Sequence, residues 1–241
     1  ENVTNYSFLF SKDRFHRPNL EIVDGKLKAV SGSLKYDSRP IWNIKGKEEQ
    51  IEAFPQLKFE IGFETAWPKF IDNDFKYHRV QGQLLTKFRM LNMGLSQIYI
   101  SAGYSDRALP PQRFFVIDYG DMDFKRIVDF KTQGENNFVG DKSLSLYYGH
   151  DFGGKLFQRL SLPLLKDTPL SFYLYGGSFW TNFGDEAIFR QTSGESVAKT
   201  PYSEIGFGFG RIPPIFMKTY FTWQLSDYDT NKFTFKIGFE F

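Results

Sequence analysis

The segment KFTFKIGFEF, residues 232–241, places a large apolar side chain at every second position. Lysine, threonine, glycine and glutamate occupy the positions between them. Successive side chains of a β-strand point to opposite faces of the sheet, so this alternation predicts a strand with one apolar face and one polar face. In a soluble protein the apolar face would line a core, whereas in a membrane barrel it would contact lipid. The segment by itself leaves both alternatives open.

Length and composition narrow the classes of protein to consider. A chain of 241 residues can form one undivided β domain, and its net charge of +2 gives no indication of a nucleic-acid partner. Phe, Trp and Tyr make up 19% of the residues, and the absence of Cys excludes disulfides and thiolate metal sites. No run of residues approaches the roughly 18 apolar residues of a spanning helix, so any membrane-spanning part must consist of strands.

The same alternation recurs along nearly the whole chain and predicts about nine or ten strands. The alternating segments are 30–36, 57–63, 79–89, 98–104, 143–149, 170–175, 204–210, 217–225 and 232–241. Polar segments between them predict loops at 46–50, 70–75, 183–196 and 226–231. No helical pattern of useful length is present. The sequence therefore predicts an all-β, antiparallel fold in a single domain, residues 1–241.

The two faces of these strands differ in size as well as in polarity. The polar face is rich in Gly and Ser, whereas the other face is crowded with Phe, Leu, Ile and Tyr. Large side chains fit best on the convex outside of a barrel and small ones on its concave inside, which favours a transmembrane β-barrel over a soluble barrel or sandwich. Aromatic residues near strand ends would form the interfacial girdles, namely Tyr36, Trp42, Trp67, Tyr104, Trp180 and Trp223.

The side of the sheet on which a residue lies also predicts which substitutions it tolerates. Arg at the outward Phe221 should be tolerated poorly, and Arg at the inward Thr222 should be tolerated better. Gly206, Gly208 and Gly210 would remove side chains from the inner wall where a loop or a neighbouring strand approaches. The inner wall also carries charged residues, namely Lys58, Glu60, Glu64, Arg79, Lys87 and Arg89. These charges could pair across strands or select an anionic solute.

Residues 107–137 interrupt the alternation. Long segments without regular structure are uncommon in compact domains and are often functional. This one holds too many apolar side chains for a freely solvated loop, so we predict that it folds into the barrel lumen or caps the rim. The residues assigned to this lumenal loop are Arg113, Phe114, Phe115 and Asp118. Arg113 and Asp118 would be its tethers to lumenal charges such as Glu60 or Lys87.

Candidate catalytic and metal-binding residues are few. The histidines are His16, His78 and His150, and no pair has zinc-ligand spacing. A lipid-facing Ser–His pair could support a membrane phospholipase, but Ser143 and Ser145 lie on the opposite face from His150. We therefore assign no catalytic, cofactor-binding or metal-binding residue.

Several segments resemble outer-membrane β-barrels. The ending FTFKIGFEF resembles the C-terminal strand that such barrels present to the barrel assembly machinery. The resemblance implies an assembly signal formed by Phe233, Phe235, Ile237, Gly238, Phe239 and Phe241. GSLKYDSRP (32–40), PYSEIGFGFG (201–210) and FMKTYFTWQL (216–225) resemble strands of the surface-antigen (BamA-like) barrels, and LPPQRFF (109–115) lies where those barrels carry a lumenal loop. The Arg-Gly tetrapeptide usual after that loop is replaced here by DYGDMDFKRI (118–127).

The segment 136–165 is similar to a Bacteroidota outer-membrane family of unknown function, whose members carry a carboxypeptidase-regulatory-like domain before the barrel. The resemblance covers roughly residues 25–241. It implies a small relative of the superfamily barrel or the C-terminal part of a larger one. It also implies a non-enzymatic protein of the bacterial outer membrane, a structural or assembly/export component of an envelope complex. The partners would be outer-membrane lipid, the assembly machinery and other envelope proteins, with no nucleic acid and no cofactor. The alternatives are an outer-membrane enzyme that acts on lipid and a soluble ligand-binding β-barrel.

Overall fold

The structure of the chain is a computed structural model. It describes residues 2–3, 25–44, 47–50, 54–67, 73–90, 92–117, 130–133, 138–161, 165, 167–184, 197–212 and 217–239. Side chains are described for all of these except residues 2–3, 41–44, 47–50 and 238–239.

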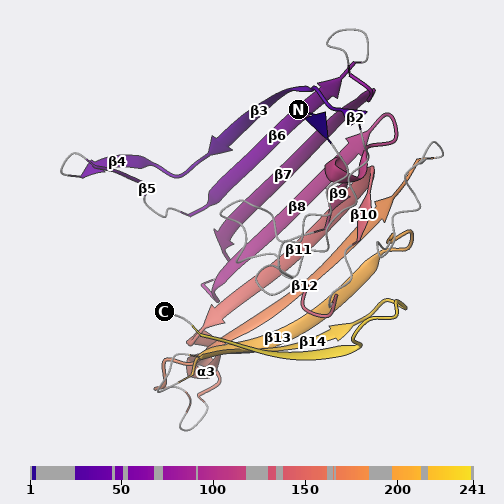
Figure 1. Ribbon diagram of the computed structural model, residues 1–241. Coiled ribbons are helices and arrows are strands. Elements are labelled where there is room, and N and C mark those ends of the chain that lie inside the picture. The colour runs from indigo at the N-terminus through magenta and orange to yellow at the C-terminus, as the bar shows by residue number, and fades with distance from the viewer. Residues whose placement is uncertain are drawn as a thin grey trace.

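Nine antiparallel strands form the main sheet of this described part of the chain. In spatial order they are β15 (Phe233–Phe239), β14 (Met217–Gln224), β13 (Tyr202–Ile212), β12 (Ser171–Asn182), β11 (Lys142–Gly153), β8 (Leu95–Ser105), β7 (Tyr77–Arg89), β6 (Gln56–Ala66) and β3 (Val30–Asp37). The strands follow one another around the sheet in sequence order (Figure 1). This arrangement confirms the predicted all-β antiparallel fold and its strand count.

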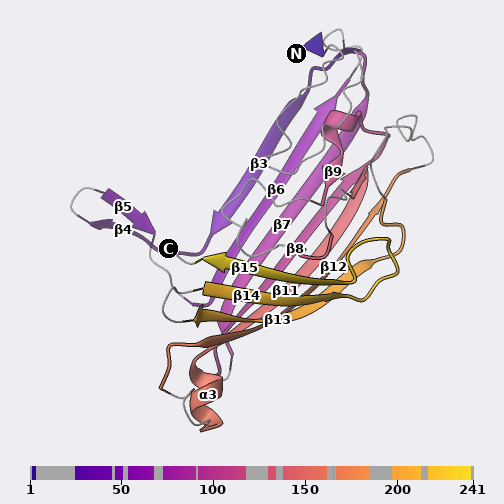
Figure 2. The same ribbon diagram turned by 60° about the horizontal axis from the view of Figure 1, so that its bottom comes forward.

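The main sheet curves but does not close. The strands β13, β14 and β15 swing away from the direction of β6, β7 and β8, so the sheet encloses a concave face (Figure 2). The edge strands β3 and β15 do not pair with each other, and within the described residues neither has a partner on its outer edge.

Smaller elements lie in the connections between strands. They are β1 (Asn2–Val3) with β2 (Gly25–Lys26), β4 (Ile41–Ile44) with β5 (Lys47–Gln50), the 3₁₀ turn η1 (Pro111–Arg113), β9 (Phe115–Val116) with β10 (Val139–Gly140), and the helix α3 (Lys155–Arg159). The hairpin β4–β5 projects away from the main sheet (Figure 1). The predicted loop at 46–50 is therefore wrong for Lys47–Gln50. Backbone pairing with Ile41–Ile44 forms this strand, although its charged sequence shows no alternation.

The exposed apolar side chains of the main sheet occupy the predicted outward positions on strand after strand. They are Val30, Leu34, Tyr36, Leu57, Ile61, Phe63, Val80, Tyr104, Leu144, Leu146, Tyr148, Leu174, Ile205, Trp223, Phe233, Phe235 and Ile237. Leu34, for example, is 63% exposed. A soluble protein would bury most of these side chains. An exposed apolar surface of this extent indicates contact with another apolar surface.

The buried core lies on the opposite, concave face. One cluster contains Tyr77, Leu109, Phe114, Phe115 and Val139, and a second contains Phe130, Phe138, Phe179 and Tyr202. A third consists of Leu85, Tyr99, Tyr147 and Tyr175 from four adjacent strands. Each cluster buries large rings, and full burial of one such side chain contributes about 1.5–3 kcal/mol.

Glycines on the inner face of β13 let tyrosines of β12 lie flat against the sheet. A Cβ at Gly206 would lie 2.6 Å from Tyr175 Oη, and one at Gly210 would overlap the Tyr173 hydroxyl. The Tyr175 hydroxyl then lies 2.8 Å from Thr222 Oγ1, which belongs to the next strand but one. These contacts confirm that the glycines make room for a neighbouring strand.

Candidate functional site

The described residues of the connection between β8 and β11, namely 106–117, 130–133 and 138–141, pack on the concave face of the sheet. Phe115 is buried, and its ring lies over Gly103 of β8, where a Cβ would come within 2.5 Å of the ring. Phe114 packs edge-to-face on Phe183, with 4.8 Å between ring centroids. An aromatic ring can rest on the sheet backbone here because residue 103 has no side chain.

A second aromatic ring of the same connection makes the same kind of contact. Phe130 lies over Gly177 of β12, where a Cβ would approach its ring to 2.8 Å. Its ring also meets Phe179 edge-to-face, with a centroid distance of 4.7 Å. Such aromatic pairs contribute about 0.5–1.5 kcal/mol beyond their buried area. The connection is therefore held at two strands, β8 and β12, which lie on either side of β11.

Polar groups fix the first part of the connection to β6 and β7. Arg79 Nη1 donates a hydrogen bond of 3.0 Å to the carbonyl oxygen of Arg113, and the Arg79 guanidinium lies 4.7 Å from the centre of the Phe115 ring. Arg113 Nε lies 3.5 Å from Glu64 Oε1, and the Tyr77 hydroxyl donates to the same carboxylate. These contacts place two cations and one carboxylate at the inner wall.

The predicted tether of Arg113 to a charge of the inner wall is present in the structure. Its carboxylate partner is Glu64, not Glu60, because Glu60 is engaged 3.1 Å from Lys35 Nζ, its direct cross-strand neighbour. The η1 turn places Arg113 close to the C-terminal end of β8, where the connection begins. Asp118, the other predicted tether, lies outside the described residues.

Glu204 of β13 clamps the second part of the connection. Its carboxylate accepts hydrogen bonds from the backbone N–H groups of Lys131 at 2.9 Å and Thr132 at 3.0 Å, and from Thr132 Oγ1 at 2.8 Å. Glu204 is only 2% exposed. The Lys131 ammonium lies over two rings, 4.6 Å from the centre of Tyr175 and 4.9 Å from that of Tyr220.

Sequence reasoning missed this clamp. The available signal was Glu204 itself, the one carboxylate on the inner side of β13. The next residues on that side are Gly206, Gly208 and Gly210. A buried carboxylate needs donors, and two consecutive backbone N–H groups supply them. Nothing in the spacing indicates that these donors come from residues 131 and 132.

A polar cavity of about 470 Å³ lies beside the connection. Its lining is Ser31, Gly32, Ser33, Glu60, Gly62, Phe63, Glu64, Arg79 and Gln81. Gly62 leaves space between the carboxylates of Glu60 and Glu64 on the same strand face. The pairs Lys35–Glu60 and Asp37–Lys58 join direct cross-strand neighbours at 3.1 and 3.4 Å, which supports the pairing interpretation for these charges.

His150 has a serine partner that sequence reasoning did not identify. His150 Nδ1 lies 2.8 Å from the hydroxyl of Ser96, its direct neighbour on β8. Ser96 is 0% exposed, and its hydroxyl also lies 3.3 Å from that of Tyr148. The ring of Phe152 packs edge-to-face on the imidazole. A hydroxyl enclosed in this way cannot reach a substrate, so the arrangement is a buried polar pair between strands.

The predicted assembly-signal residues lie on or beyond β15. Phe233, Phe235 and Ile237 face outward and are about half exposed, at 49%, 48% and 52%. Phe233 and Phe235 pair with Trp223 and Phe221 of β14. Gly238 and Phe239 complete the strand, whereas Phe241 lies outside the described residues.

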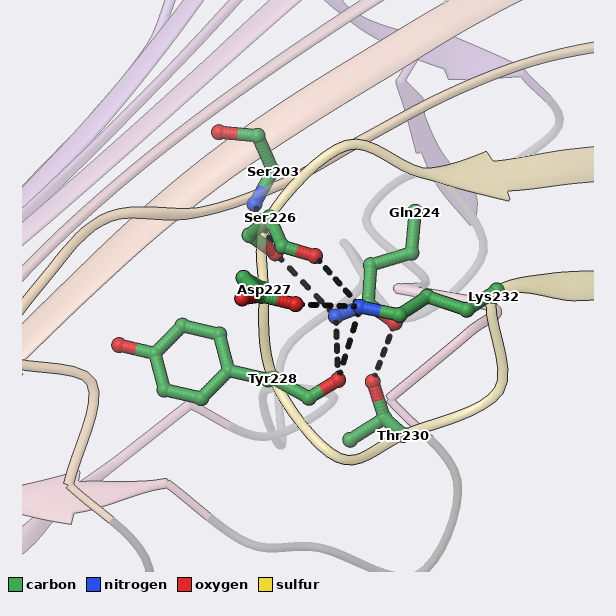
Figure 3. A network of polar contacts seen from close by, with 7 residues as sticks. All are labelled: Ser203, Gln224, Ser226, Asp227, Tyr228, Thr230 and Lys232. Carbon is green, nitrogen blue, oxygen red and sulfur yellow. Dashed lines mark hydrogen bonds and ion pairs between the residues drawn. The ribbon is translucent and has the colours of Figure 1, made fainter.

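The turn between β14 and β15 is fixed by a polar network (Figure 3). Lys232 Nζ donates to the carbonyl oxygens of Ser226 at 3.1 Å and Tyr228 at 3.2 Å, and lies 3.3 Å from Asp227 Oδ1. Gln224 Nε2 donates to the Tyr228 carbonyl oxygen at 3.2 Å. The network sets the register in which the last strand leaves the turn.

Among the residues whose placement is described, no group of three or more His, Asp or Glu side chains could hold a metal ion. No helix in those ranges has the length and apolar character needed to cross a membrane.

Comparison with known proteins adds evidence on the fold. No protein-family model matches the sequence, and no curated protein matches it either. Among solved structures, the fold is similar to that of CdiB from Acinetobacter baumannii, an outer-membrane β-barrel, with a TM-score of 0.52 and 14% sequence identity. The alignment covers 86% of this chain and 32% of CdiB, so the chain spans about a third of the length of that protein. At this identity the similarity concerns the fold alone: the chain has the antiparallel fold of an outer-membrane β-barrel.

Proposed function

We propose that this chain forms part or all of a transmembrane β-barrel in the bacterial outer membrane. Its proposed role is non-enzymatic, as a structural or assembly/export component of an envelope complex. The observation that carries the proposal is the apolar face exposed on the strands of the main sheet. Lipid is the partner that matches a surface with exposed apolar side chains on all nine strands of the main sheet, whereas a protein partner would cover only part of it.

The height of this face suits a bilayer. On β12 the outward aromatic residues Phe172 and Trp180 lie near opposite ends of the strand, eight positions apart, a rise of about 26 Å along the strand at roughly 3.3 Å per residue. For a strand tilted by roughly 35–45°, this rise corresponds to a height of about 18–21 Å across the bilayer. The apolar band of outer-membrane barrels is about 25 Å tall. The Trp180 indole Nε1 donates to the Lys199 carbonyl oxygen at 3.0 Å, which satisfies its polar group at the boundary.

We propose further that additional strands complete the barrel. Neighbouring strands of the main sheet all run antiparallel, so β3 and β15, the first and ninth, run in the same direction. Direct pairing of these two edges would be parallel, whereas an antiparallel ring needs an even number of strands. The coverage of only 32% of CdiB supports a larger barrel of which this chain supplies one part.

The described parts of the segment 107–137, residues 107–117 and 130–133, then lie in the lumen of the barrel. The contacts of Phe115 with Gly103, of Phe130 with Gly177 and of Glu204 with residues 131 and 132 support this assignment. Residues packed inside the barrel narrow the lumen. A narrowed lumen suits a regulated export channel or a structural protein better than an open diffusion pore. We also propose that the chain is related to the surface-antigen barrels and to the Bacteroidota family described above.

Extraction and gel mobility test the proposed location. The protein should sediment with membranes, require detergent for extraction, and migrate differently on a gel before and after boiling, because a folded barrel resists the detergent at room temperature. A protein that stays in solution without detergent and migrates identically in both states would refute the membrane barrel and favour the soluble alternative.

A further inference from the structure

The connection between β11 and β12 forms a short helix beyond the ends of those strands (Figure 2). Gly153, with φ of 56°, ends β11, and its N–H donates to Asp151 Oδ1 at 2.6 Å. The helix α3 follows, and Ser161 ends it with a φ of 50°. A left-handed residue just after the last turn is a common way to stop a helix. Residues 153–161 of the connection therefore have a defined structure.

Contacts with the β7–β8 turn set the orientation of α3. Phe157 is buried on its protein side. Lys155 Nζ donates to the carbonyl oxygen of Asn92 at 3.0 Å, and the Arg159 guanidinium contacts Met93 Sδ. Lys155 and Arg159 are four residues apart and so lie on one side of the helix. Both cations remain exposed to the surroundings.

The same element exposes leucines. Leu160 is 59% exposed and Leu165 is 36% exposed, and the sequence between residues 160 and 165 reads LSLPLL. A single exposed leucine is ordinary, but a short connection with four leucines in six residues is not. Cations beside exposed leucines form the pattern of an element that lies in the plane of a membrane interface.

The element also begins where the outward apolar face ends. Phe152 and Phe172, which flank the connection on β11 and β12, have ring centroids 5.8 Å apart, and Phe172 continues to Phe209 of β13 at 5.5 Å. These rings form the last outward row of the sheet at this end. The helix therefore lies directly beyond the proposed lipid-facing surface, where the lipid headgroups would begin.

We propose that α3, Leu160 and Leu165 form an interfacial anchor that binds anionic phospholipid. The leucines would enter the boundary between headgroups and acyl chains, and Lys155 and Arg159 would bind the lipid phosphate groups. The acidic residues of this connection and its strand ends are Asp151, which accepts from Gly153 N–H, and Asp167. The anchor rests on the proposed membrane barrel and extends it by naming a lipid class and the residues that select it.

A labelling experiment separates the anchor from the barrel. The chain has no cysteine, so the single-cysteine variants Leu160→Cys, Leu146→Cys and Asp227→Cys can each carry one bimane fluorophore in vesicles of phosphatidylcholine and phosphatidylglycerol. The label at Leu160 should be quenched by lipid with a nitroxide on the headgroup and resist iodide. The label at Leu146, on the outward face of β11, should be quenched by a nitroxide in the acyl chain, and the one at Asp227 by iodide.

The outcomes distinguish the two proposals. If iodide reaches Leu160 while Leu146 remains in the acyl region, the anchor is wrong and the barrel stands. If neither iodide nor lipid quenches the label at Leu160, another protein surface covers it and the anchor is again wrong. If iodide quenches both Leu160 and Leu146, the membrane barrel itself fails.

A charge-removal experiment tests the lipid class. In the Leu160→Cys background, headgroup quenching by nitroxide-labelled phosphatidylglycerol should exceed that by labelled phosphatidylcholine at least twofold. Lys155→Gln together with Arg159→Gln should abolish this difference, while Lys199→Gln, an exposed cation in another connection, should leave it unchanged. Equal quenching by the two lipids before substitution, or a preference that survives the double substitution, would overturn the phosphate-binding role.

Discussion

Replacing Glu204 by alanine should release residues 131 and 132 from the sheet. The Glu204 carboxylate accepts the backbone N–H groups of Lys131 and Thr132 and the Thr132 hydroxyl, and all three residues are buried. Alanine supplies no acceptor, so two backbone donors would lose their partner in a site from which bulk water is excluded.

The magnitude follows from those two donors. A buried donor left without a partner costs about 1–3 kcal/mol, so the pair should destabilise the packed state of residues 131 and 132 by about 2–6 kcal/mol. Since about 1.4 kcal/mol corresponds to a tenfold change in an equilibrium constant, the open fraction should rise between about 30-fold and about 10⁴-fold.

Hydrogen exchange measured by mass spectrometry reports this opening at the two amides. In Glu204→Ala the amides of Lys131 and Thr132 should exchange faster by the factor given above, and trypsin should cut after Lys131. Asp227→Ala is the matched control, because Asp227 is fully exposed and pairs only with Lys232 in the described contacts. Unchanged exchange at residues 131 and 132 in Glu204→Ala would refute the clamp.

Three further predictions test packing, facing and assembly. Gly103→Val should lower the thermal midpoint through overpacking of about 1–3 kcal/mol against the ring above it, whereas Gly149→Ala, whose Cβ would lie 3.8 Å from the nearest atom, should leave the midpoint nearly unchanged; equal shifts would contradict the packed loop. Phe221→Arg should reduce the folded yield in lipid vesicles because a cation at the bilayer midplane costs about 2–4 kcal/mol, while the inward Ser33→Arg should fold normally; the reverse order would invert the proposed facing. Phe241→Asp should lower the amount of protein in the outer membrane without reducing synthesis, and normal levels in the membrane would contradict the assembly signal.

The strands could be predicted because each carries its own signal. Alternation in β6, β8 or β15 depends only on side chains two positions apart, and a lipid-facing strand shows it strongly. The hairpin β4–β5 and the helix α3 carry no such signal. Lys47–Gln50 is charged throughout, and five helical residues are too few to display a 3.6-residue period.

The contacts of the candidate site could not be predicted because they join distant positions. Ser96 meets His150 across 54 residues, and Glu204 meets Thr132 across 72. Such pairs depend on strand register and on the path of the connection. An alternating pattern of apolar and polar residues gives no information on either. The predicted tolerance of Arg at Thr222 did not take account of such a contact. This residue faces inward as predicted, but it is 0% exposed because Tyr175 covers it.

The central claim is that the outward face contacts lipid, and nitroxide scanning along β11 tests it most directly. Single spin labels placed at Leu144, Ser145, Leu146 and Tyr147 in the cysteine-free chain report collisions with oxygen, which concentrates in the bilayer, and with a water-soluble nickel complex. Labels at Leu144 and Leu146 should collide often with oxygen and rarely with nickel. Labels at Ser145 and Tyr147 should show low oxygen collision rates because both residues are buried on the concave face of the sheet. Frequent nickel collisions at Leu144 and Leu146, or no alternation between neighbours, would contradict the account.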